Sequence, residues 1–131
     1  MVALALTTGL LAQSTFAYSY SDPTNNDQTV YSLASTSDGG FIFVGPSEGV
    51  GVVRLTSSGV VSWAKDLTVS GAGDGLAVIQ TTDGGYVVAG SAGIDHMLLL
   101  KFNSSGSLTG YYSYGTTWDG AKSVIQDSSY I

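Results

Sequence analysis

The chain alternates short apolar runs with turns rich in Gly, Ser, Thr and Asp. Runs such as 41–44 (FIFV) and 97–100 (MLLL) lie between glycine-containing segments. Short runs of β-branched and aromatic residues flanked by turn residues are typical of strands rather than helices. We therefore predict an all-β fold, with strands near residues 30–36, 41–45, 50–55, 60–67, 76–81, 86–90, 97–102 and 107–114.

Glycines that follow aspartate predict tight hairpin turns between the strands. They occur at Asp38-Gly39-Gly40 and Asp83-Gly84-Gly85. Glycine adopts the positive φ that such turns need, and the aspartate side chain can bond to the turn backbone. We expect at least one glycine of each turn at positive φ.

The predicted strands belong to a tandem repeat. Three motifs recur in the same order at a period of about 46 residues, within the range of four-stranded propeller blades. The motif pairs are residues 37–45 (SDGGFIFVG) with 82–90 (TDGGYVVAG), 54–59 (RLTSSG) with 101–106 (KFNSSG), and 74–80 with 119–126. The chain thus divides into an N-terminal segment (1–28), a first repeat (29–74), a second repeat (75–119) and the start of a further repeat (120–131).

Continuous apolar strands such as 97–100 favour a sheet that is buried on both faces. A β-propeller provides this environment, because each four-stranded blade is covered by a blade on either side. The D-G-G-[FY] turn with its following strand, the S-S-G turn and Trp63 also resemble the tandem β-propeller repeats of bacterial and archaeal exported proteins. The resemblance covers residues 29–127 and implies blades without implying a function. Gly110 departs from it, because it stands near the place of Trp63.

The two ends of the chain match parts of the repeat. Residues 2–17 resemble the apolar region of a signal peptide without its positive start. Alternatively, residues 1–28 supply the last two strands of a split blade, since 6–10 and 16–20 resemble the turn and strand at 103–114. Fewer than three blades result, whereas closed propellers use about four to eight. We expect a partial propeller, completed by other copies or by blades of a longer chain.

Composition excludes several classes of partner. Ten acidic residues against four basic ones give a net charge of −6, which disfavours nucleic acid. The absence of cysteine removes disulfides, thiolate metal sites and cysteine nucleophiles. Residues 2–17 are too short, and too rich in Thr and Gln, for a membrane span.

No pattern in the chain indicates catalysis. The single histidine, His96, follows Asp95, and adjacent strand residues point to opposite faces, so we expect a histidine in a loop or at the start of a strand. No G-x-S-x-G elbow accompanies Ser14 or Ser70, and Glu48 is the only glutamate. We expect no enzyme, and no catalytic, cofactor-binding or metal-binding residue.

Two further segments have a structural interpretation that we prefer to a ligand site. Residues 22–27 (DPTNND) offer oxygen ligands but lack the spacing of a calcium loop, and 71–75 lacks the lysine of a phosphate loop. We interpret the first as a solvated loop. Asn103-Ser104-Ser105 is a glycosylation sequon on a predicted exposed turn.

The aromatic residues leave two functions open. They could pack between blades or stack on sugars; we favour packing. The residues concerned are Trp63, Trp118, Tyr18, Tyr20, Tyr111, Tyr112 and Tyr114. We expect a noncatalytic structural or assembly module, secreted or on the cell surface, that associates with itself. A lectin-like, carbohydrate-binding propeller is the first alternative, and a fragment of a larger surface protein with its active part elsewhere is the second.

Overall fold

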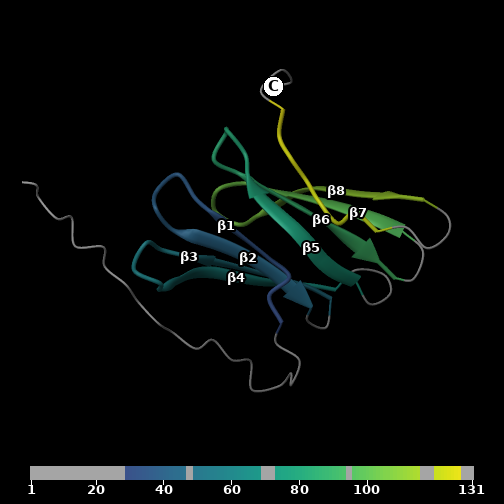
Figure 1. The fold of residues 1–131 in the computed structure, drawn as a ribbon, viewed down its shortest axis with the longest axis horizontal. Helices are drawn as coiled ribbons and strands as arrows, with labels where there is room; N and C mark the ends of the chain where they lie inside the picture. Colours follow the sequence, from purple (N-terminus) through teal and green to yellow (C-terminus); the bar gives the residue numbers. More distant parts are fainter. Residues whose placement is uncertain (1–28, 47–48, 69–72, 94–95, 116–119, 128–131) are drawn as a thin grey trace, which may run out of the picture.

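A computed structural model describes residues 29–46, 49–68, 73–93, 96–115 and 120–127. These residues form two four-stranded antiparallel sheets and no helix, which confirms the all-β prediction (Figure 1). The first sheet has the order β1 (Ser32–Ser35), β2 (Phe41–Pro46), β3 (Val50–Leu55), β4 (Val61–Leu67). The second has the order β5 (Gly73–Gln80), β6 (Tyr86–Ala92), β7 (His96–Phe102), β8 (Leu108–Tyr114).

The first sheet spans residues 32–67 and the second spans residues 73–114, and in each sheet the strands lie in chain order. The sheets are consistent with two blades, and the part of the chain described does not close into a ring. None of its elements is a helix able to cross a membrane.

Four hairpin turns share one backbone pattern. In each turn the first residue donates its N–H to the carbonyl of the residue four positions later, as Thr81 does to Gly85 at 2.9 Å. The glycine three positions after the first residue donates its N–H to the carbonyl of that first residue, as Gly84 does to Thr81 at 2.9 Å. The glycines lie at φ +80° to +81°, namely Gly39, Gly59, Gly84 and Gly106. The prediction of positive φ in both D-G-G turns is confirmed.

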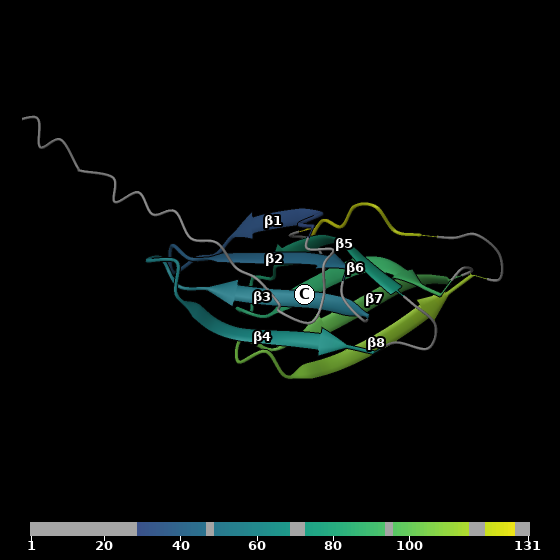
Figure 2. The same ribbon diagram turned by 90° about the horizontal axis from the view of Figure 1, so that it is seen from below.

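The hydrophobic core lies between the two sheets, which stack face to face (Figure 2). Ile42, Val44, Val50 and Val52 of the first sheet have no exposed surface. They meet Val78, Val88, Leu98, Leu100 and Phe102 of the second sheet, all at most 4% exposed. Full burial of each such side chain contributes about 1.5–3 kcal/mol in transfer free energy.

The stacking joins unlike faces of the repeat. We call the core-facing side of the first sheet its front, and the core-facing side of the second sheet its back. Register places Ile42 and Arg54 on the front of the first sheet, whereas their repeat equivalents Val87 and Lys101 point away from the core. The face of the second sheet that is equivalent to the front of the first sheet therefore points away from the core.

Burial on both faces holds only in part. In β7 the back residues Leu98 and Leu100 are fully buried, whereas Met97 on the front is 37% exposed. The apolar run at 97–100 is thus covered on its back but not along its whole front.

Candidate functional site

The junction between the sheets contains a polar network that begins at the first D-G-G turn. Asp38 accepts hydrogen bonds from the Thr36 hydroxyl at 2.6 Å and from the Gly40 N–H at 3.3 Å. The turn backbone and the short β1–β2 hairpin hold these donors in place. The Thr36 hydroxyl first, then the Gly40 N–H and the Arg54 charge, lower the pKa of Asp38 below its ordinary value.

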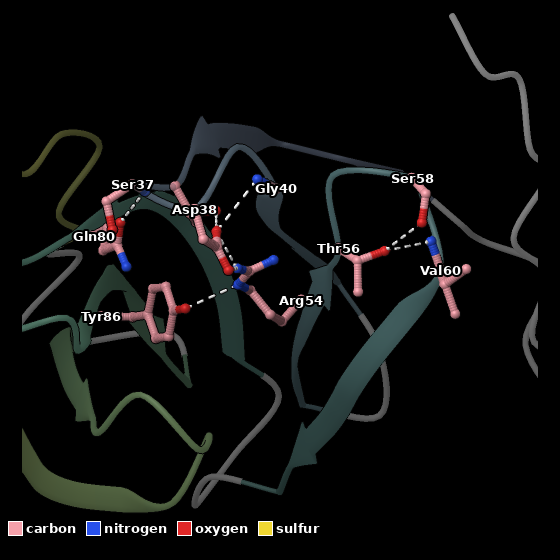
Figure 3. A network of polar contacts seen from close by, with 10 residues as sticks. Ser37, Asp38, Gly40, Arg54, Thr56, Ser58, Val60, Gln80 and Tyr86 are labelled. Carbon is pink, nitrogen blue, oxygen red and sulfur yellow. Dashed lines mark hydrogen bonds and ion pairs between the residues drawn. The ribbon is translucent and has the colours of Figure 1, made fainter. Parts of the chain in front are cut away.

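Arg54 of β3 carries this network across to the second sheet (Figure 3). Its Nη2 contacts both carboxylate oxygens of Asp38, at 2.6 and 2.5 Å, and its Nε donates to the Tyr86 hydroxyl at 2.9 Å. Arg54 is only 5% exposed, so its charge needs these partners. A Cβ on Gly40 would collide with Arg54 Nη1, which explains the second glycine of the turn.

A glutamine adds a second bond across the junction. The backbone N–H of Ser37 donates to Gln80 Oε1 at 2.7 Å, as Figure 3 shows. Gln80 is the last residue of β5, so this bond joins the turn of one sheet to the first strand of the next.

Trp63 of β4 provides the aromatic part of the junction. Its ring lies 5.7 Å from Tyr86, edge to face, and 6.3 Å from Phe102, stacked. It also covers Gly106, where a Cβ would lie 2.7 Å from the indole. The prediction that Trp63 packs between the sheets is confirmed.

The same arrangement begins again on the front of the second sheet. Asp83 accepts from the Thr81 hydroxyl at 2.5 Å and from the Gly85 N–H at 3.1 Å, and the pKa of Asp83 is lowered by these bonds in that order. The N–H of Thr82 donates to Gln126 Oε1 at 2.9 Å, and Gln126 Nε2 donates to Thr82 Oγ1 at 3.0 Å. Gln126 thus repeats the role of Gln80.

Two features of the first junction do not recur in this part of the chain. Lys101 stands in the place of Arg54; its Nζ lies 3.5 Å from Asp83, and its side chain is 48% exposed. Gly110 stands in the place of Trp63, and a Cβ there would lie 2.8 Å from the Tyr112 ring. Tyr112 therefore covers the position that the indole would occupy.

The residues weighed for chemistry are not brought together. His96 is exposed at the start of β7, as predicted. Asn103 caps its turn, accepting through Oδ1 from the Ser105 and Ser107 N–H groups. Across the ranges described, no three His, Cys, Asp or Glu side chains lie close enough to hold a metal. The remaining candidates lie outside the described residues: Ser14, Tyr18, Tyr20, residues 22–27, Glu48, Ser70, Gly71, Ala72, Asp95 and Trp118.

Sequence reasoning missed the residues that cross the junction. It did not single out Arg54, Gln80 or Tyr86 as a connected set. The signal was present, because Gln80 and Gln126 occupy one position of the repeat and Arg54 is matched by Lys101. A basic residue inside an apolar strand indicates a buried partner.

Comparison with known proteins finds no matching family model, no matching curated protein and no matching solved structure.

Proposed function

We propose that the protein is a noncatalytic structural module, secreted or on the cell surface, whose blade-like sheets assemble by stacking front to back. The bond from a turn N–H to a glutamine of the following layer carries this proposal. It joins Ser37 to Gln80 at the first junction and Thr82 to Gln126 at the second. A bond between layers that recurs at the same position of the repeat supports a chain whose sheets stack.

Carbohydrate binding is supported less well. A lectin-like propeller would need equivalent aromatic residues in each groove. Tyr111, Tyr112 and Tyr114 on β8 are 46–53% exposed, but their equivalents on β4 are Ala64, Lys65 and Leu67. These three tyrosines therefore have no aromatic equivalents on the first sheet and do not form a repeated set.

The mass and location of the native particle test the proposal. An epitope-tagged chain expressed in its own host should be found outside the cytoplasm, in particles heavier than one chain of 13.4 kDa. A cytoplasmic chain, or a particle of one chain alone, would contradict it.

A further inference from the structure

The front of the second sheet is an apolar surface that is uncovered along β7 and β8. Met97 is 37% exposed, and Tyr112 and Tyr114 are 49% and 53% exposed. On the first sheet the residues equivalent to Met97 and Leu99 are Val50 and Val52, and both are fully buried under the second sheet. Met97 is thus exposed and Leu99 half-buried, where their equivalents at the first junction are fully covered.

The other half of this front is already covered in the manner of the first junction. Residues 120–127 lie beside β5 and β6, where Ala121 donates its N–H to the Gly90 carbonyl at 3.0 Å (Figure 2). A Cβ on Gly120 would lie 3.8 Å from Ser91, a front residue of β6. Ala89, also on the front of β6, is only 1% exposed. Residues 120–127 do not form a strand, but they lie over β5 and β6 in the place that β5 takes over β1 and β2.

No residue that the structure describes covers the front of β7 and β8 in this way. Residues 1–28 contain a matching pattern. Tyr18-Ser19-Tyr20 repeats Tyr112-Ser113-Tyr114, and Leu4 and Leu6 precede it at the same spacing at which Leu98 and Leu100 precede Tyr112. Leu98 and Leu100 are the fully buried back residues of β7, so Leu4 and Leu6 have the side chains that a covering strand needs.

We propose that the β7–β8 half of this front binds residues 1–28 of a second copy of the chain. In this arrangement residues 1–28 of the second copy and residues 120–127 of the first copy together cover the front of the second sheet. This proposal rests on the assembly role proposed above and names its partner and its two contact surfaces. Burial of Leu4 and Leu6 against Leu99 continues the front-to-back packing seen between the two sheets.

Two full-length variants test the two contact surfaces separately. We call residues 1–28 the donor segment and the β7–β8 half of the front the acceptor surface. Leu99→Asp places a charge on the acceptor surface and leaves residues 1–28 intact, whereas Leu6→Asp does the reverse. At a concentration where the unaltered chain forms particles of two or more copies, each variant alone should have the mass of one chain, 13.4 kDa. An equimolar mixture should form a dimer of one copy of each, because one intact donor and one intact acceptor remain. Val60→Asp, at a position 58% exposed on the turn before β4, is the control and should assemble normally.

Cysteine pairing keeps the test independent of variants that fail to fold. The chain has no cysteine, so Leu6→Cys and Leu99→Cys introduce the only thiols. Mixed single-cysteine chains should cross-link to a heterodimer under mild oxidation, and each chain alone should not. A purified chain that stays monomeric, or assembly that survives both aspartate variants in folded protein, would overturn this inference. If this inference failed but the native particle were larger than one chain, the proposed assembly role would stand, and the chain would assemble through a different contact.

Discussion

The two junctions share a turn and its bond to a glutamine, but they differ in the basic and aromatic residues beside it. At the first, Arg54 is 5% exposed and bonds to both Asp38 and Tyr86. At the second, Lys101 is half exposed and lies near Asp83. The bonds inside the turn are the same in both repeats, from a threonine hydroxyl and a glycine N–H to the aspartate. The turn and its bond to a glutamine are therefore properties of each repeat, whereas the contacts of the basic and aromatic residues depend on the particular pair of faces.

Removal of the Trp63 indole should change the stability of the two junctions most unequally. Trp63→Ala takes away contacts with Tyr86 and Phe102, and we expect it to lower the free energy of unfolding by about 3 kcal/mol. Tyr112→Ala, at the ring that covers Gly110, should cost less than about 1 kcal/mol because that ring is half exposed. Denaturant titration of both variants measures the difference. Equal losses would show that Trp63 does not couple the sheets.

A pair of glycines with the same backbone conformation isolates that contact. Gly84→Ala should cost about 1 kcal/mol, because φ is +80° and no atom beyond the adjacent residues lies within 4 Å of the new methyl group. Gly106→Ala has the same strain at φ +81° and in addition meets the Trp63 ring at 2.7 Å, so we expect about 2 kcal/mol or more. In a Trp63→Ala background the two glycine variants should cost the same amount. A difference that persists there would contradict the role of the indole.

Converting the first junction into the second tests the charged pair. Arg54→Lys should lower the free energy of unfolding by about 1–2 kcal/mol, because Arg54 reaches Asp38 and the Tyr86 hydroxyl from two separate nitrogens, whereas lysine has a single nitrogen to place between them. Lys101→Arg should change it by less than about 0.5 kcal/mol at its exposed site. Thermal and denaturant unfolding provide the measurement. If Arg54→Lys were as mild as Lys101→Arg, the burial of Arg54 would not matter.

The pH dependence should show the smallest difference, since both turns lower the pKa of their aspartate. A folded-state pKa below the ordinary 3.8 means that this stabilisation is complete above pH 3.8 and is lost as the pH falls through the folded value. Thr36→Val and Thr81→Val remove the hydroxyl that contributes most, so the folded-state pKa of the neighbouring aspartate rises towards 3.8 and each variant should lose less stability below pH 3.8 than the unaltered chain. Unfolding measured from pH 7 down to pH 2 tests this. An unchanged acid profile would mean that the hydroxyl bonds do not stabilise the carboxylates.

Local features of the fold could be predicted because adjacent residues determine them. Glycine at positive φ fixes the hairpins, and the apolar runs place β3 at Val50–Leu55 as expected. Strand ends were less accurate: β5 begins at Gly73 rather than near residue 76, because pairing with β6 up to Ala92 extends it through two glycines. Ladder bonds there outweigh the low strand propensity of glycine.

Contacts between the repeats could not be predicted, because they depend on which faces meet. The bond from Arg54 to Tyr86 joins residues 32 positions apart in different sheets. The repeat pattern alone does not say whether the front of one sheet meets the back or the front of the next. Trp63 was expected to pack between layers, but its partner Gly106 follows only from the direction of stacking.

The hairpin turns affect the order in which parts of the protein unfold. Each turn closes on its own residues, so it needs no neighbouring layer to complete its backbone bonds. The free energy of folding then separates into an intrinsic part for every sheet and a nearest-neighbour part for every junction. The junction with Arg54 and Trp63 has the larger neighbour part. Amide hydrogen exchange should therefore report opening from the outer face of the second sheet inward, with the valines of β2 and β3 exchanging last.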